Sequence, residues 1–166
     1  MKEILRRCRI FDRFDDRHLS GITTLAARRT LQAGEHLFRL GDTADSLFVV
    51  LDGLVELCLP LSIQGALQEI VVHTEGPGGA LGWSAFVKPN RFQLSARTAR
   101  PATVAGFERV AVLRLIEADP VFGCAFFESI AELIGRRHLT MQALWARELQ
   151  RSVASGLHGS REGSAG

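Results

Sequence analysis

Residues 33–57 read AGEHLFRLGDTADSLFVVLDGLVEL, with short apolar stretches separated by glycine-containing turns. Within them, Phe48-Val49-Val50-Leu51 is an uninterrupted apolar run, which is typical of a strand buried on both faces. Similar strand-like pieces recur as far as Arg100, and turn residues interrupt the chain every eight to twelve positions. Short strands at this spacing predict a β-sandwich or a jelly roll.

The hydrophobic period becomes helical on both sides of this region. Upstream, the acidic pair Asp15-Asp16 precedes apolar residues at helical spacing, and downstream Asp119-Pro120 offers a cap followed by a first helical residue. The predicted class is therefore α+β, mainly β, a jelly-roll-like double-stranded β roll with N-terminal helices and a long C-terminal helix. The expected domain covers residues 1–151, with helices over 1–29, the β roll over 30–110 and helices over 111–151. A Gly/Ser-rich tail, residues 152–166, is expected to be disordered.

Composition excludes several classes of protein. The chain has 166 residues, of which 46% are hydrophobic and 23% charged, as in one ordinary globular domain. No apolar run approaches the roughly 18 residues of a membrane span, and the charged start MKEILRRCRI is unlike a signal peptide, so a cytoplasmic location is expected. The net charge of +2 gives no domain-wide field for a nucleic acid backbone.

Cysteine and histidine usage indicates neither a disulfide framework nor a metal site. Cys8, Cys58 and Cys124 are far apart among apolar neighbours, which favours buried, reduced thiols. The histidines are scattered, and none has the spacing of a zinc ligand pair. No phosphate-binding loop or nucleophile motif is present, so we expect no enzyme, no catalytic residues, no metal and no cofactor.

Two stretches resemble a known family. Residues 33–42 and 47–57 resemble the opening hairpins of the cyclic-nucleotide-binding domain family, which includes the catabolite-activator-like regulators. The glycine spacing is similar as well: Gly34, Gly41, Gly53 and Gly82. Leu81–Arg100 lies where the family has its phosphate-binding cassette, and we call this segment the cassette. The resemblance runs from about Leu5 to Gln150 and implies the family's β roll in a small regulatory or sensory module.

The cassette departs from the family at its ligand anchors. After the cassette glycine the family typically has a Glu that accepts from the ribose hydroxyl, whereas Trp83 can only donate. The register of the family's phosphate-pairing Arg falls on Phe92 or Gln93, and the nearest cation is Arg91. With Leu81–Ala85 followed by a Pro, an Arg and a second Arg near Arg97, the chain resembles a divergent, stand-alone bacterial sub-group of the family.

The resemblance and the residue chemistry together give a set of candidate ligand-binding residues: Gly82, Trp83, Ser84, Ala85, Arg91, Gln93, Ser95 and Gln142. Gly82 opens a short helical stretch whose free N–H groups suit a phosphate, but a structural turn would need glycine equally. Arg91 is expected either to form an ion pair with a bound anion or to be a solvated loop residue. Ser95 is expected to form a hydrogen bond either to a phosphate oxygen or to a neighbouring strand. Trp83 stacks on a purine or fills the pocket, and Gln142 reads a purine edge or faces solvent.

Two functions follow from these observations. The first is a regulatory or sensory module whose ligand is cyclic AMP or another cyclic nucleotide. The alternative is a degenerate domain that binds no nucleotide and serves as a protein-interaction or scaffold module, with a regulatory partner protein that the sequence does not identify. The apolar stripe over residues 130–145 predicts a homodimer. DNA is not an expected partner, because only about fifteen residues follow the long helix, where the regulators have a helix-turn-helix.

Overall fold

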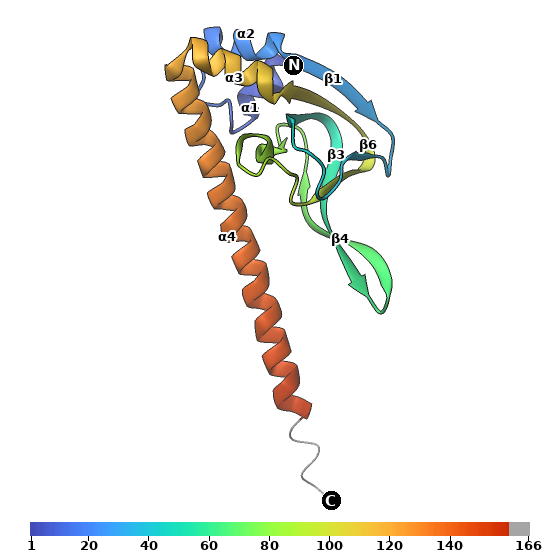
Figure 1. Ribbon diagram of the computed structural model, residues 1–166. Coiled ribbons are helices and arrows are strands. Elements are labelled where there is room, and N and C mark those ends of the chain that lie inside the picture. Colours follow the sequence, from blue (N-terminus) through green and yellow to red (C-terminus); the bar gives the residue numbers. More distant parts are fainter. Residues whose placement is uncertain (160–166) are drawn as a thin grey trace, which may run out of the picture. The chain divides into compact units, whose positions relative to one another are not determined.

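The computed structural model describes residues 1–159, with side chains through residue 154 (Figure 1). Residues 1–130 form one compact unit, and the chain from Ala131 onward forms a second. The elements in chain order are the helices α1 (Lys2–Arg7) and α2 (Asp16–Thr24), the strands β1 (Ala26–Leu31), β2 (His36–Phe38), β3 (Ser46–Ile63), β4 (Ala66–Glu75) and β5 (Ala80–Leu81), the short 3-10 helix η1 (Trp83–Phe86), the strand β6 (Ser95–Glu108), and the helices α3 (Arg109–Ala118) and α4 (Pro120–Gly159).

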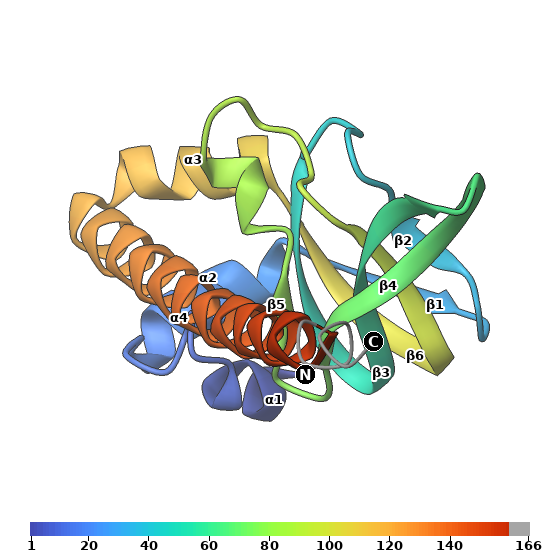
Figure 2. The same ribbon diagram turned by 90° about the horizontal axis from the view of Figure 1, so that it is seen from below.

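The strands form one antiparallel sheet that curves into a roll. Strands β1, β6, β3 and β4 lie side by side in that order, while β2 pairs with β6 and β5 pairs with β3 (Figure 2). The pairing of β3 with β6 shifts register three times between Val50 and Val55, around Gly53. Such irregularities bend a strand and increase its twist, which curves the sheet. The predicted α+β class and β roll are confirmed.

The interior of the roll is built from alternate residues of facing strands. Leu57 of β3 lies opposite Ala96 of β6, and both are buried in the apolar core together with Phe38 and Phe92. Glu56 and Arg97, the next pair along, point to the other face of the sheet because side chains alternate along a strand.

A second buried layer joins the helices to the roll. The Phe11 ring lies 5.6 Å from Phe107 of β6, and the Phe14 ring lies 4.8 Å from Phe122 of α4. The helical spacing of Phe122, Phe126 and Phe127 predicts that all three pack against the roll. Phe122 and Phe126 are fully buried, as this packing requires, whereas Phe127 is 42% exposed, so for Phe127 the prediction is wrong.

Element boundaries differ from the predictions at three places. The first helical region ends at Thr24, because Ala26–Leu31 pairs with β6, and this tertiary pairing overrides the helix propensity of Ala26, Ala27 and Arg28. Asp52-Gly53 is an irregularity inside β3 and not a turn between two strands. Helix α4 continues through Gly159, so residues 152–159 of the expected tail are helical, and residues 160–166 lie outside the described part.

Both predicted helix starts are confirmed. The Asp15 carboxylate accepts a hydrogen bond from the His18 N–H at 2.8 Å and caps α2. The Asp119 carboxylate accepts from the Phe122 N–H at 3.1 Å, where α4 begins. Short acidic side chains satisfy backbone donors that have no partner within the helix.

Candidate functional site

The first half of the cassette keeps a tight backbone turn before η1. Gly82 has φ of +81°, in the left-handed region, and caps η1. A Cβ atom at this position would lie 2.7 Å from the Ser46 carbonyl oxygen and 3.3 Å from the Phe48 ring. The fold itself therefore requires glycine here, so the presence of Gly82 does not by itself indicate a ligand.

The side chains of η1 are used mainly in packing. Ser84 and Ala85 are buried and Trp83 is half-buried. The Phe86 ring packs edge-on against Phe126 of α4, with 4.9 Å between ring centroids. This contact, which the sequence analysis did not anticipate, couples the cassette to the first turns of α4 within the first unit.

Arg91 is committed to the fold. Its guanidinium donates a hydrogen bond to the Gly41 carbonyl oxygen at 2.7 Å, and its backbone forms a bridge with Thr43. The side chain is exposed, as a solvated loop arginine would be. In this conformation Arg91 ties the cassette loop to the turn that follows β2.

The position where the family's arginine is expected holds an aromatic stack. The Phe92 ring lies nearly parallel to Phe38 of β2, with 3.8 Å between centroids and 9° between planes. Phe92 is 5% exposed, whereas its neighbour Gln93 is exposed. The Ser95 hydroxyl accepts from the Leu40 N–H at 3.1 Å, so it is bound to the turn that follows β2 and not to a neighbouring strand as weighed above.

Lys88-Pro89-Asn90 has the residues of a turn, and in the structure the Asn90 side chain holds that turn to η1. Its φ of +58° is tolerated by asparagine better than by most residues. The side-chain amide donates to the carbonyl oxygen of Ala85 at 2.9 Å, and it also reaches those of Ser84 and Val87. Asn90 therefore satisfies the carbonyl groups at the end of η1 and closes the loop on itself.

Arg97 is neutralised by carboxylates on neighbouring strands. Its guanidinium lies 3.1 Å from Glu56 of β3 and 3.4 Å from Glu69 of β4, and His36 of β2 contacts Glu69 at 2.9 Å. The hydrogen bond that Arg97 donates to the Glu56 carboxylate raises the pKa of Arg97. Because this cluster lies on the face opposite Leu57 and Ala96, it holds β2, β6, β3 and β4 together outside the apolar interior.

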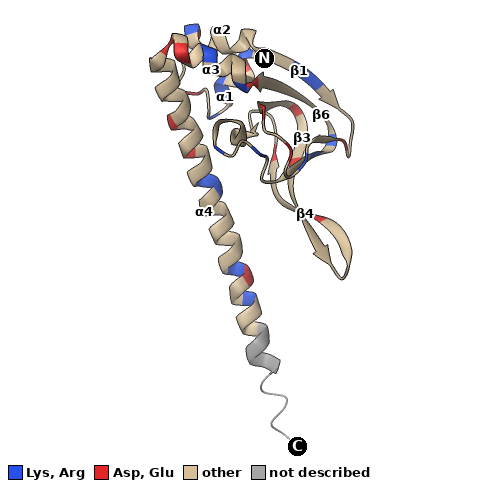
Figure 3. Ribbon diagram, viewed as in Figure 1, with Lys and Arg blue, Asp and Glu red and all other residues tan. Residues whose placement is uncertain are grey.

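Gln142 and most of the apolar stripe belong to the second unit. Gln142 is exposed, as are Leu144 and Trp145, whereas Ile130, at the end of the first unit, is 3% exposed. Acidic and basic residues both occur along α4, for example in the pair Glu132 and Arg136 (Figure 3). The roles of Gln142 in base reading and of the stripe in dimerisation stay predictions.

The three cysteines differ in their burial. Cys8 and Cys58 are buried as predicted, and burial raises the pKa of the Cys8 thiol to about 12. Cys124 is exposed on α4, so the expectation that it is buried is wrong.

Within the described residues, no group of three or more metal-ligating side chains comes together, and no helix is long and apolar enough to cross a membrane.

Solved structures share this fold at low identity. A cyclic nucleotide-binding domain of Methylobacillus flagellatus is 18% identical with a TM-score of 0.73, covering 87% of this chain and 80% of that one. The catabolite activator protein of Thermus thermophilus is 20% identical with a TM-score of 0.69, covering 95% and 73%. The regulatory domain of Toxoplasma gondii PKA, solved with cAMP, is 21% identical with a TM-score of 0.57, covering 66% and 41%.

Sequence comparison gives the family directly. Among curated proteins none matches this chain. Residues 28–119, more than half of the chain, match the cyclic nucleotide-binding domain. The matched segment runs from β1 to the end of α3 and contains the whole cassette. The chain therefore belongs to the cyclic nucleotide-binding domain family.

Proposed function

We propose that this chain is a regulatory module whose cassette keeps the family fold without the family's nucleotide anchors, and that it acts through contacts with another protein. The observation that carries the proposal is the use of the cassette's second half. Phe92 is stacked on Phe38, and Arg91 is bound to the Gly41 carbonyl oxygen. A cyclic phosphate is recognised best by a bidentate arginine, and neither residue offers one in this arrangement.

The ribose side lacks an anchor as well. Trp83 follows the cassette glycine, and an indole N–H cannot accept a hydrogen bond from a hydroxyl group. Ser84 is buried, and Ser95 already accepts a backbone hydrogen bond. These residues support an interaction or scaffold role, and we expect no catalytic activity.

A second candidate function is a sensor for a small nucleotide, cyclic AMP included. The observation that favours it is the retained turn at Gly82, which presents the start of η1 as the family's cassette does. The Phe86–Phe126 contact would carry a displacement of η1 to α4. In this function, the ligand shifts the module only if it contacts one position of η1 better than another.

A thermal-shift scan separates the two candidates. The protein is heated with millimolar cyclic AMP, cyclic GMP, a cyclic dinucleotide, AMP or ATP. A ligand present at 100 times its dissociation constant stabilises by about 2.7 kcal/mol, which is about 5–11 °C for a chain of this size. We expect no shift above 1 °C. A shift of several degrees that Arg91→Ala abolishes would reject the interaction-module proposal and establish the sensor.

We also propose that the second unit mediates homodimer formation through α4. Leu139, Trp145, Leu149 and Val153 are each more than 60% exposed, and apolar surface of this extent is usually covered. Light scattering at micromolar concentration should give twice the chain mass of 18.2 kDa. A monomeric mass at that concentration would reject the dimer.

The cytoplasmic location stays a prediction from the sequence.

A further inference from the structure

His18 of α2 contacts a carboxylate with each of its ring nitrogens. Nδ1 lies 3.0 Å from Asp15 Oδ1, and Nε2 lies 3.1 Å from Asp119 Oδ2. The histidine side chain is 20% exposed and lies beside the rings of Phe14 and Phe122, at centroid distances of 6.0 and 5.6 Å. The imidazole is thus held in one orientation by its neighbours.

Only the protonated ring can satisfy both contacts. A neutral imidazole has one N–H donor and one bare nitrogen, and a bare nitrogen facing a carboxylate has no hydrogen to share. The imidazolium ion donates a hydrogen bond from Nε2 to Asp119, and its positive charge attracts the Asp15 carboxylate that lies beside Nδ1. The geometry at His18 is therefore that of a cation between Asp15 and Asp119.

Both carboxylates also cap helices. Asp15 accepts from the His18 N–H at the start of α2, and Asp119 accepts from the Phe122 N–H at the start of α4. These backbone bonds fix the carboxylate positions independently of the imidazole. His18 consequently bridges the starts of α2 and α4. The two residues in contact, His18 and Asp119, are 101 positions apart in the sequence.

Two charged residues close to this contact in the sequence are paired elsewhere. Asp16, next to Asp15, is paired with Arg6, and Arg13 is paired with Glu128 at 3.2 Å. The groups that contact the imidazole in the described part of the chain are thus Asp15 from α2, Asp119 from the α3–α4 junction, and two phenyl rings.

We propose that His18 is a proton-dependent clamp that holds the start of α4 to α2, tightening the α3–α4 junction when the imidazole is charged and loosening it when the imidazole is neutral. The proposal goes beyond the function proposed above and does not depend on nucleotide binding. The ligand that it adds is the proton, and the element that it biases is the first turn of α4.

The sign of the pH dependence follows from the two kinds of group. The ring carries the charge that attracts both carboxylates only while it holds its second proton, so the clamp weakens as the pH rises and that proton is lost. The carboxylates must be ionised, which sets an acid limit. The Phe122 N–H and then the His18 ring hold the pKa of Asp119 below its ordinary value, so Asp119 stays charged to a lower pH than a free aspartate. The clamp is therefore strongest in mildly acidic solution.

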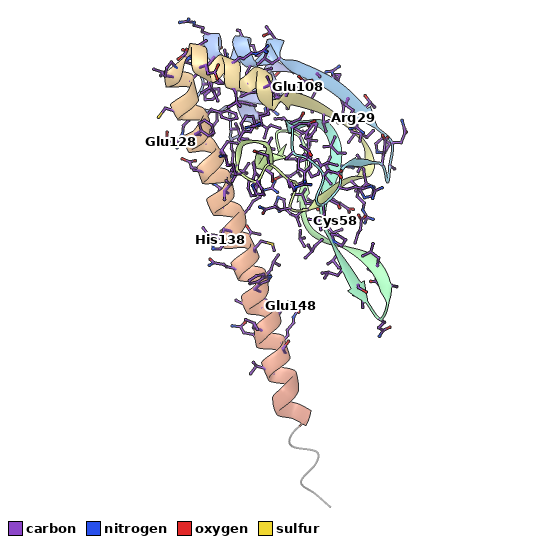
Figure 4. All side chains as sticks on the ribbon, in the orientation of Figure 1. Arg29, Cys58, Glu108, Glu128, His138 and Glu148 are labelled. Carbon is purple, nitrogen blue, oxygen red and sulfur yellow. The ribbon has the colours of Figure 1, made fainter. Side chains whose placement is uncertain are left out.

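The test compares thermal midpoints of the full chain at pH 5.5 and pH 8.0. Between these values, wild type should lose about 2–4 °C more than His18→Gln, because the variant has no proton to release there. Asp15→Asn keeps an equally good cap but removes the charge facing Nδ1, and should lose part of the same dependence. His138→Gln, on an exposed histidine of α4, is the matched control and should behave as wild type (Figure 4).

A second readout looks at the junction itself. Hydrogen exchange of the Phe122 amide, corrected for the intrinsic pH effect, should be several-fold faster at pH 8.0 than at pH 5.5 in wild type and nearly unchanged in His18→Gln. If His18→Gln lowers the midpoint equally at both pH values, and exchange at Phe122 shows no pH dependence, His18 has only a structural role and the proposal is wrong.

Discussion

The first half of the cassette, Leu81–Phe86, has the backbone shape expected for a phosphate cradle, whereas the side chains of the second half, Val87–Arg100, hold the loop in place. Gly82 is left-handed and opens η1 in the first half. In the second half, Asn90 donates to η1 carbonyl groups, Arg91 donates to Gly41, and Phe92 packs on Phe38. Backbone shape and side-chain anchoring are thus separate properties of this segment.

The difference shows that a cassette can keep its shape without contacts to a ligand. The resemblance described above implies that in the family the second half of the cassette supplies the cation that faces the phosphate. Here Asn90, Arg91 and Phe92 already have partners inside the chain, so the loop is ordered by its own contacts. Substitutions in the two halves should therefore act mainly on folding, and we can rank their effects.

The largest effect is expected for Phe92→Ala. Removing a buried ring leaves a cavity beside Phe38, and such changes cost about 3–5 kcal/mol. Chemical denaturation should show this loss, whereas Gln93→Ala, at the exposed neighbour, should change stability by less than about 0.5 kcal/mol. Equal effects of the two variants would contradict the assignment of Phe92 to the core.

The next effect is expected for Gly82→Ala. The left-handed backbone costs an alanine about 1–2 kcal/mol, and the contact with the Ser46 carbonyl oxygen adds overpacking, giving about 2–4 kcal/mol in total. Gly34→Ala is the matched control, since Gly34 has a similar φ of +79° but no atom within 4 Å of the added Cβ. Thermal melts of the two variants should differ by several degrees. Similar midpoints would show that the turn at Gly82 can open.

A smaller loss is expected for Asn90→Ala. The variant gives up the hydrogen bonds to η1 and places alanine at a positive φ, at a cost of about 1–2 kcal/mol. Asn90→Gly removes the amide but accepts the backbone angle, so it should be less destabilised than Asn90→Ala. A midpoint of Asn90→Gly equal to that of wild type would mean that the amide contributes nothing, and the reverse order of the two variants would mean that chain flexibility dominates.

The sequence predicts the roll better than it predicts the site. Turn glycines and apolar alternation depend on neighbours in the chain, so they indicate the strands and the turn at Lys88-Pro89-Asn90 correctly. The partner of Phe92 is Phe38, and that of Arg91 is Gly41, each about 50 positions away. No local pattern reveals such pairs. The predicted boundary between the helices and the roll, at residues 29 and 30, was wrong for the same reason. Ala26–Arg29 form a strand only because they pair with β6.

The smallest effect is expected for Arg91→Ala, and it tests the comparison most directly. An exposed side chain with one hydrogen bond to a carbonyl group contributes about 0.5–1.5 kcal/mol, and Arg100→Ala, at an exposed arginine of β6, should cost less. If Arg91 serves the loop alone, the variant loses this stability and shows the same absence of a cyclic AMP response as wild type in calorimetric titration. If wild type binds and Arg91→Ala binds at least ten-fold more weakly, the guanidinium must leave Gly41 when ligand arrives. The second half of the cassette would then be an anchor that the empty protein holds against its own backbone, and the separation between shape and binding would fail at this residue.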